Sequence, residues 1–415
     1  MTELERIGEG AVKAAKLLNN ADSKFKNKLL KKIAEKLIEN KDAIIEENKK
    51  DIENAKKADM PLAMQDRLLF TEERLKAAAD GVLKVMEIDD PVGEILEKWE
   101  RPNGLKIEKR RVPLGVIGVI YESRPNVTVD TAVLCLKASN AVILRGGKEA
   151  VNTNRILADT MRRAIGEAGA DENIISFVAD TSRDSATEMM RLNGYIDVLI
   201  PRGGAGLINA VVRNATVPVI ETGVGNCHIY VDKTADVKMA AEIVINAKTS
   251  RPSVCNAAES LLIHRDVDES FFEILKKAFE NSGVKVVGCE RCTKIFNCEK
   301  IADEEDYAKE FLDKIISVKI VNNIEEAIAH ISKYSTKHSE CIITSDDESA
   351  ALFADSIDAA AVYVNASTRF TDGFEFGFGA EIGISTQKLH ARGPMGLKEL
   401  TSYKYVISGD GQIRK

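Results

Sequence analysis

The chain lacks the features that mark membrane and secreted proteins. No apolar run approaches the roughly 20 residues that a membrane-spanning helix needs. The segment Met1–Arg6 is charged and contains no apolar signal core. Hydrophobic residues make up 44% and charged residues 30% of the sequence, a balance typical of a globular protein in water. We therefore expect a cytoplasmic protein with no membrane partner.

A net positive charge and the residue spacing of a metal site are also lacking. The formal net charge of −7 argues against a nucleic acid partner. The histidines are scattered, and Cys289, Cys292 and Cys298 have no second pair of ligands at the spacing of a structural zinc site. We predict that no metal is bound. An odd count of seven cysteines without a signal sequence favours reduced thiols over disulfides.

The pattern of apolar residues predicts two α/β domains, because 415 residues are too many for one hydrophobic core. Amphipathic helices are expected first, and Pro102-Asn-Gly104 separates two alternating runs that predict a hairpin over 97–112. From 113 onward, short apolar runs alternate with helical segments, as parallel sheets covered on both faces require. The predicted strands are 116–120, 141–144, 174–178, 196–200, 219–220, 228–231, 260–263, 284–287, 315–321, 340–344 and 361–364, and the predicted helices are 25–38, 41–58, 127–138, 151–168, 182–192, 236–248 and 268–281. The domain break is expected just after residue 225.

Two glycine-rich turns follow predicted strands and precede helices. Backbone N–H groups at such turns can approach a phosphate at a helix N-terminus, and basic side chains add positive charge. Neither turn matches the G-x-G-x-x-G pattern, so the pair indicates either a nucleotide site or two ordinary turns. The residues concerned are Arg145, Gly146, Gly147 and Lys148 in the first turn, and Gly203 and Gly204 in the second.

A cysteine and a glutamate stand in two segments rich in small and polar residues. Cys255 lies in Arg251-Pro-Ser-Val-Cys-Asn-Ala-Ala-Glu259, and Glu221 begins Glu221-Thr-Gly-Val-Gly-Asn226. A thiolate attacks carbonyl or acyl carbons, and a carboxylate can act as its base. Either residue alone is more often a buried thiol or a surface charge. The prediction therefore depends on whether the two segments face each other.

Two polar loops follow predicted strands. Ser123, Arg124 and Asn126 come directly after the strand 116–120, at the carboxyl end where ligands of α/β sheets collect. Their side chains could donate to an anionic substrate or to a developing oxyanion. Arg369 lies in the loop after 361–364 and suits a carboxylate or a phosphate, or else a surface salt bridge.

The segments 112–127, 221–228, 251–259, 364–373, 376–387 and 390–394 closely resemble the gamma-glutamyl phosphate reductase branch of the aldehyde dehydrogenase superfamily. The resemblance covers essentially the whole chain. It implies a two-domain fold of that superfamily, with parallel-rich sheets, flanking helices and an oligomerisation hairpin. The implied reaction is the NADPH-dependent reduction of L-glutamyl 5-phosphate to L-glutamate 5-semialdehyde and phosphate in proline biosynthesis. The implied partners are this substrate, further copies of the chain and glutamate 5-kinase.

The resemblance also implies roles for the domains and for single residues. Residues 1–225 would bind the cofactor NADPH or NADP, residues 226–380 would carry catalysis, and residues 381–415 would return to the cofactor-binding and oligomerisation region. Cys255 falls on the catalytic cysteine and Glu221 on the glutamate base. For the cofactor, Arg145 would bind the 2′-phosphate and Glu310 the ribose. The anions of the substrate would be bound by Arg124, Arg251 and Arg369. The donors to the oxyanion would be Ser123, Arg124, Asn126 or the N–H of Cys255.

Two other functions compete with this interpretation. A CoA-acylating aldehyde dehydrogenase would use the same thiol but pass the thioester to coenzyme A. The arginine-bearing loops favour a small dianionic substrate instead. A non-catalytic nucleotide-binding protein on the same scaffold would be expected to lack Cys255 or Glu221, and both are present.

Overall fold

The computed structural model describes residues 1–414, which form two compact units. The first unit comprises Met1–Thr222, Gly377–Gly383 and the chain from Met395 onward, and the second comprises Gly223–Phe376 and Ile384–Pro394. The break expected after 225 thus falls just inside the second unit. The C-terminal segment expected from 381 onward is shared between the two units.

The first unit begins with a group of amphipathic helices. Thr2 and Glu5 form a capping box at the start of the first helix, and the Asp22 side chain accepts the N–H of Phe25 at the start of the second. The predicted helices 25–38 and 41–58 are confirmed, whereas the helices over 3–18 and 72–87 were not predicted. The elements are α1 (Glu3–Leu18), α2 (Ser23–Glu39), α3 (Lys41–Lys57), α4 (Leu62–Leu68) and α5 (Glu72–Glu87).

A four-stranded parallel sheet of order β5-β4-β3-β6 forms the core of the first unit. Every residue of β3 and β4 is buried, and apolar runs make up most of both strands. The strands are β3 (Val116–Tyr121), β4 (Ala141–Gly146), β5 (Ile175–Phe177) and β6 (Val198–Arg202). The helices are α6 (Pro125–Lys137), α7 (Val151–Glu167), α8 (Arg183–Met190) and α9 (Ala205–Asn214), and the short 3-10 helices are η1 (Lys148–Ala150), η2 (Glu172–Ile174) and η5 (Lys398–Leu400).

The strand predicted at 219–220 is wrong. Only one bridge forms there, between Val219 and Leu199. Pro218 has no N–H to give to a ladder. The chain then leaves the sheet at Thr222, whose hydroxyl donates to the carbonyl of Pro201 at 2.6 Å.

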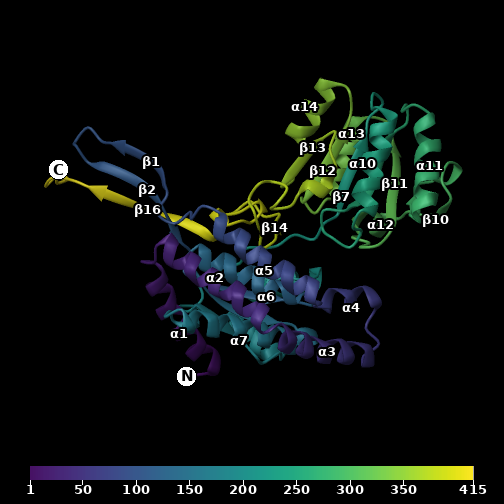
Figure 1. Ribbon diagram of the computed structural model, residues 1–415. Coiled ribbons are helices and arrows are strands. Elements are labelled where there is room, and N and C mark those ends of the chain that lie inside the picture. The colour runs from purple at the N-terminus through teal and green to yellow at the C-terminus, as the bar shows by residue number, and fades with distance from the viewer. Residues whose placement is uncertain (415) are drawn as a thin grey trace. The chain divides into compact units, whose positions relative to one another are not determined.

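The predicted hairpin is confirmed and belongs to a separate antiparallel sheet of the first unit. β1 (Ile95–Glu100) pairs with β2 (Lys106–Pro113), and β16 (Thr401–Ser408) pairs with the other edge of β2. This three-stranded sheet extends away from the helices of the unit (Figure 1). It leaves large side chains exposed: Trp99 by 36%, Tyr405 by 51% and Ile407 by 58%.

The second unit is built on a seven-stranded parallel sheet of order β10-β9-β11-β8-β7-β12-β13. Successive residues of its strands face opposite sides: Leu261 of β8 packs in one buried cluster with α10 and α11, and Leu262 packs in the other with α13 and α14. The strands are β7 (Cys227–Val231), β8 (Ala258–His264), β9 (Lys285–Gly288), β10 (Cys298–Ile301), β11 (Ile315–Val321), β12 (Ser339–Ile343) and β13 (Ala361–Val364). The helices are α10 (Val237–Thr249), α11 (Ser270–Ser282), α12 (Glu304–Ala308), α13 (Ile324–Tyr334) and α14 (Asp347–Ser356), with η3 (Cys292–Lys294), η4 (Thr368–Phe370) and the small hairpin β14 (Ile384–Ser385) and β15 (Gly393–Pro394).

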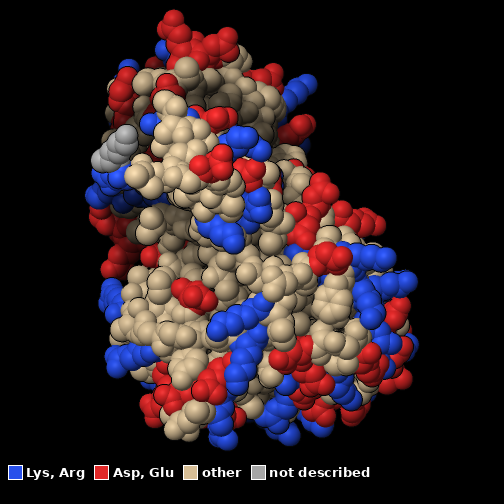
Figure 2. All heavy atoms as spheres, turned by 90° about the vertical axis from the view of Figure 1, so that its left-hand side faces the viewer, with Lys and Arg blue, Asp and Glu red and all other residues tan. Residues whose placement is uncertain are grey.

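Charged side chains of both signs are interspersed over the face shown in Figure 2. Across residues 1–414, no helix combines the length and the apolar character needed to cross a membrane.

Candidate active site

Cys255 lies in the turn that precedes β8, at the amino end of the sheet of the second unit. Its thiol is half-buried. Its carbonyl oxygen accepts a hydrogen bond from the Sγ of Cys227, the first residue of β7, at 3.1 Å. Burial raises the pKa of Cys227 well above its usual value, so Cys227 keeps the proton that it donates. The neighbouring strand thus holds the backbone of the turn.

The segment that follows Glu221 packs against this turn. A side-chain carbon at Gly225 would overlap the carbonyl group of Cys255, so only glycine allows the two backbones to lie this close. The N–H of Gly225 donates to Oε1 of Glu310 at 2.8 Å. Glu310, predicted to bind ribose, is therefore placed beside the Cys255 turn.

Arg369, in the loop after β13, makes hydrogen bonds to residues on both sides of Cys255 in the sequence. Its Nε donates to Oγ of Ser250 at 3.0 Å, and its Nη1 donates to Oδ1 of Asn256. Asn256 in turn donates to the carbonyl oxygens of Arg369, at 3.2 Å, and Thr371, at 2.9 Å. Burial lowers the pKa of Arg369, and the charge of Arg251 lowers it further. The partners of Arg369 are therefore polar groups of the site and not the surface salt bridge considered above.

A buried ion pair lies beneath the turn. Nζ of Lys248, on α10, is 2.5 Å from Oε2 of Glu259 on β8, and both side chains are fully buried. Oε1 of Glu259 accepts the N–H of Leu312 at 3.1 Å. Burial raises the pKa of Glu259 and lowers that of Lys248, while the attraction between them opposes both shifts. The pair ties α10 and the start of β8 to the chain segment that carries Glu310.

In the first unit, the predicted polar loop lies at the carboxyl end of β3. Ser123 is buried and has a positive φ of 42°, a strained conformation for a residue other than glycine. Both its N–H, at 2.7 Å, and its hydroxyl, at 2.8 Å, donate to Oε1 of Glu149. Arg124 is the N-cap residue of α6. Asn126 is exposed and donates to Asp130 at 3.0 Å.

The two glycine-rich turns end β4 and β6, on either side of β3. Gly204 is the N-cap residue of α9, and its N–H donates to Oε2 of Glu122 at 3.0 Å. Nη2 of Arg145 donates to the carbonyl oxygens of Thr181, at 2.8 Å, and Ser182, at 2.6 Å. Burial lowers the pKa of Arg145. Lys148 is exposed.

These turns suit a phosphate-bearing cofactor. The start of α9 already binds an anion, because the carboxylate of Glu122 occupies the position that a helix N-terminus offers to a phosphate. The buried Nε of Arg145 has no hydrogen-bond partner among residues 1–414. Such an atom can bind an acceptor that the chain itself does not supply.

The structure therefore gathers the predicted residues in two places. Ser123, Arg124 and both glycine-rich turns meet at the carboxyl ends of β3, β4 and β6 in the first unit. Cys255, Arg251, Arg369 and Glu310 meet at the amino end of β8 in the second. Glu221 belongs to the first unit and is half-buried. Sequence reasoning missed Glu122, Glu149, Lys248, Asn256 and Glu259, although Asn256 and Glu259 stand in the segment quoted for Cys255.

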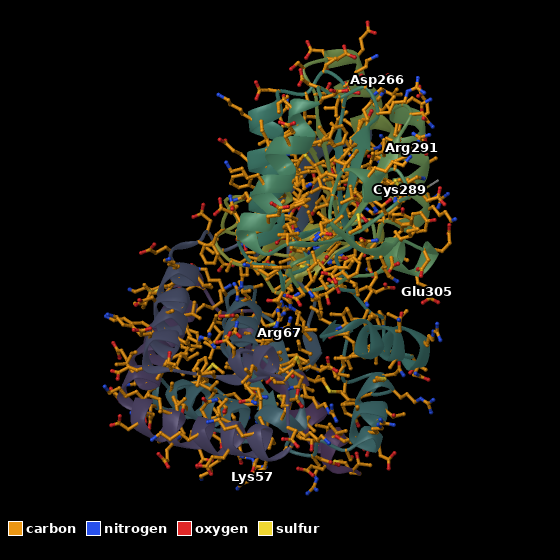
Figure 3. The ribbon with its side chains drawn as sticks, turned by 90° about the vertical axis from the view of Figure 1, so that its right-hand side faces the viewer. Lys57, Arg67, Asp266, Cys289, Arg291 and Glu305 are labelled. Carbon is orange, nitrogen blue, oxygen red and sulfur yellow. The ribbon has the colours of Figure 1, made fainter. Side chains whose placement is uncertain are left out.

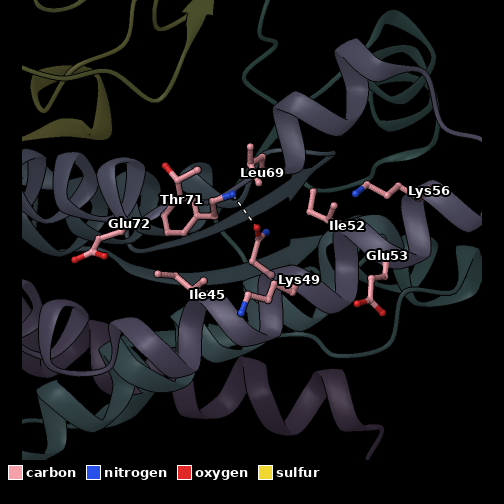
Figure 4. A pocket seen from close by; sticks show the side chains of 10 residues that line it. Ile45, Lys49, Ile52, Glu53, Lys56, Leu69, Thr71 and Glu72 are labelled. Carbon is pink, nitrogen blue, oxygen red and sulfur yellow. Dashed lines mark hydrogen bonds between the residues drawn. The ribbon is translucent and has the colours of Figure 1, made fainter.

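A separate hollow of about 470 Å³ lies in the first unit between α3 and the segment 69–72. Figure 4 shows side chains that line it, among them Ile45, Ile52 and Leu69. Oδ1 of Asn48, another lining residue, accepts the N–H of Phe70 at 2.8 Å. None of the predicted site residues lines this hollow. Within the described part of the chain, no three His, Cys, Asp or Glu side chains converge as metal ligands.

Comparison with known proteins gives the family. The model of the aldehyde dehydrogenase family matches residues 2–289, and the chain belongs to this family. It is 59% identical over 414 residues, covering 100% of both chains, to the gamma-glutamyl phosphate reductase of Clostridium botulinum (strain Eklund 17B / Type B). The crystal structure of gamma-glutamyl phosphate reductase from Thermotoga maritima matches with a TM-score of 0.97 and 49% identity, covering 100% of each chain. An acetylating aldehyde dehydrogenase from Geobacillus thermoglucosidasius has the same fold, with a TM-score of 0.72 at 19% identity over 100% of this chain and 98% of that one. The predicted fold class and family are confirmed.

Proposed function

We propose that this chain reduces L-glutamyl 5-phosphate to L-glutamate 5-semialdehyde and phosphate, with NADPH, as a step of proline biosynthesis. The observation that carries the proposal is the turn of Cys255. This turn carries a half-buried thiol, and its backbone is held by the close approach of Gly225 and by the hydrogen bond from Arg369 to Asn256. Relatives that are 59% and 49% identical over the full length carry the name of this activity.

The reaction begins with attack of the Cys255 thiolate on the acyl carbon of the substrate. Phosphate leaves as the thioester forms, so the new carbon–sulfur bond replaces the carbon–oxygen bond to phosphate. Burial lowers the pKa of the Arg369 guanidinium, and the interaction with Cys255 raises it by a smaller amount. Arg369 and the exposed Arg251 supply positive charge for the anions of the substrate.

The oxyanion that develops at the acyl carbon needs hydrogen-bond donors. The N–H of Cys255 and the side chains of Ser123, Arg124 and Asn126 are the candidates. Without substrate, Ser123 donates to Glu149 and Asn126 donates to Asp130, so either side chain would have to change its partner. Glu221 carries the proton that returns to the thiol as the aldehyde leaves.

As a member of the aldehyde dehydrogenase family, the chain uses a nicotinamide cofactor. When bound, this cofactor supplies the hydride that reduces the thioester carbon. We assign the turns at 145–148 and 203–204 to its phosphates, with Arg145 toward the 2′-phosphate of NADPH and Glu310 toward a ribose. Without cofactor, the N–H of Gly204 donates to Glu122 and the N–H of Ser123 donates to Glu149. The phosphates would displace these two carboxylates.

Three further assignments belong to the proposal. The exposed face of the sheet β1-β2-β16 joins copies of this chain into an oligomer, since an uncovered apolar sheet face is an interaction surface. The protein works in the cytoplasm. Association with glutamate 5-kinase would deliver the acyl phosphate before it hydrolyses.

The test is the reverse reaction, in which L-glutamate 5-semialdehyde, phosphate and NADP form NADPH. We expect NADPH formation that depends on phosphate and is abolished by Cys255→Ala, while the alanine variant still binds NADPH. Replacement of phosphate by coenzyme A separates the acylating alternative: NADPH formation with coenzyme A and none with phosphate would overturn the proposal. A Cys255→Ala variant with ordinary kcat would overturn the thioester mechanism.

A further inference from the structure

Three cysteines that the proposed reaction does not use gather at one edge of the sheet of the second unit. Cys289 directly follows β9, Cys292 begins η3, and Cys298 begins β10, the edge strand. Figure 3 shows Cys289 beside Arg291 at the outer side of this unit. β9 and β8 both run parallel to β11, so Cys289 lies toward the carboxyl ends of these strands, whereas Cys255 precedes β8 at the amino end. The cluster is therefore distinct from the candidate active site.

Two of these sulfur atoms are in contact. The Sγ atoms of Cys289 and Cys292 are 3.3 Å apart. The turn between them is closed, because the N–H of Cys292 donates to the carbonyl of Cys289 at 2.8 Å. A modest side-chain movement would bring the sulfurs to the roughly 2.05 Å of a disulfide. Both thiols are reduced in the structure.

The two thiols differ in exposure and in proton affinity. Cys289 is half-buried, whereas Cys292 is fully buried and its Sγ donates to the carbonyl of Val318 at 3.3 Å. The hydrogen bond between the two thiols, together with backbone N–H groups including that of Ile320, lowers the pKa of Cys289. The hydrogen bond with Cys289, followed by burial, raises the pKa of Cys292. An accessible thiolate beside a protonated thiol is the arrangement that thiol–disulfide exchange requires.

We propose that Cys289 and Cys292 form a redox-active dithiol that a small disulfide converts into an intramolecular disulfide. Cys289 attacks one sulfur of the small disulfide, which forms a mixed disulfide and releases one small thiolate. Cys292 loses its proton and attacks the sulfur of Cys289, which releases the second small thiol. The two protein thiols lose two electrons and two protons in total, and the small disulfide is reduced to two thiols.

The sequence between the two cysteines makes the product easy to identify. Trypsin cleaves after Lys285, Arg291 and Lys294, so the reduced protein yields Val286–Arg291 and Cys292–Lys294 as separate peptides. A disulfide between Cys289 and Cys292 holds these peptides together, and the pair is lighter by two hydrogen atoms than the sum of its parts. The probe is oxidised glutathione added to the folded protein, followed by alkylation of the remaining thiols before digestion.

We expect the linked pair in the wild-type protein and its disappearance after treatment with dithiothreitol. Cys292→Ser should instead trap glutathione on Cys289, because the resolving thiol is gone. Cys298→Ser is the matched control, since Cys298 stands near Cys292 across Gly288 and should not be needed for the link. The proposal is overturned if Cys292 is linked to Cys298, or if the link appears only after the protein is unfolded. It is also overturned if Cys292→Ser leaves Cys289 unmodified.

Discussion

The carbonyl group of Cys255 fills the space that a side chain on residue 225 would need, so Gly225 and Cys255 lie backbone against backbone. The same glycine donates its N–H to Glu310. One small residue therefore connects the turn of the proposed nucleophile with a glutamate assigned to the cofactor. The identity of residue 225 should control catalysis although the residue has no reactive group.

Replacement of Gly225 by alanine should displace the Cys255 turn. The new methyl group cannot fit against the carbonyl group, so the turn must move by a substantial part of an ångström. A misplacement of about 1 Å at a reacting group can cost roughly 10²-fold in rate. We expect kcat/KM to fall by about this factor, measured by phosphate-dependent NADPH formation, with a smaller change in the binding of NADPH.

Gly81→Ala is the matched control. Gly81 lies in α5, and a side-chain carbon there would meet no atom within 4 Å. Alanine favours a helix over glycine by about 0.5–1 kcal/mol, so this variant should be as stable as the wild type or more so, with full activity. Ordinary activity of Gly225→Ala would show that the close approach has no catalytic role.

The buried pair of Lys248 and Glu259 should be essential to the second unit. Lys248→Met leaves the carboxylate of Glu259 buried without its cation, and removal of one partner of a buried pair costs about 3–5 kcal/mol. We expect a clear fall in the thermal midpoint, measured by circular dichroism. The double variant Lys248→Met/Glu259→Gln should recover much of the loss, because glutamine can still accept the N–H of Leu312.

The exposed pair of Lys333 and Glu304 provides the comparison. Its atoms are also 2.5 Å apart, but its side chains are 60% and 71% exposed. Solvent screens such a pair, so Lys333→Met should barely change the midpoint. Equal effects of Lys248→Met and Lys333→Met would show that burial does not decide the contribution of these pairs.

Much of the fold follows from local sequence. β3 is buried on both faces, so its sequence is a continuous apolar run that no surface strand would carry, and β8 contains the shorter buried run Leu261-Leu-Ile263. The hairpin of β1 and β2 follows from Pro102-Asn-Gly104 between alternating residues. The strand predicted at 219–220 failed because two apolar residues fit a strand as well as they fit a single bridge.

The site was less predictable because its contacts join distant parts of the chain. The rule that ligands gather at carboxyl ends of strands pointed to Ser123 and Arg124, which the structure has at the end of β3, but Cys255 precedes its strand. Nothing local signals that Gly225 must meet Cys255, or that Lys248 pairs with Glu259. These relationships arise only when neighbouring strands and helices have packed.

Arg145 should set the preference for NADPH over NADH. Its Nη2 donates to the carbonyl groups of Thr181 and Ser182, while its buried Nε has no hydrogen-bond partner in the part of the chain that the structure describes. Lysine keeps the charge but lacks the planar fork that can bind a phosphate while retaining these bonds. Arg145→Lys should raise the KM for NADPH about 10-fold, the effect of one charge-assisted hydrogen bond, and leave the KM for NADH nearly unchanged.

Arg155→Lys is the control for this change, because Arg155 is exposed on α7 and lies outside the two glycine-rich turns. It should alter neither KM. If Arg145→Lys raises both KM values equally, Arg145 does not recognise the 2′-phosphate.

The exposed face of β16 should control assembly. Tyr403, Tyr405 and Ile407 alternate along the strand and therefore point to one face, where Trp99 meets Tyr405 edge to face at 6.1 Å. Ile407 is 58% exposed, so Ile407→Lys should fold normally but place a charge in any interface that covers this face. Light scattering should then report a smaller assembly than for the wild type, at an unchanged thermal midpoint of the isolated subunit.

Ile413→Lys is the control, because Ile413 lies beyond the strand and is 79% exposed. This variant should leave the mass of the assembly unaltered. If Ile407→Lys keeps the wild-type mass, the sheet β1-β2-β16 does not hold the copies together.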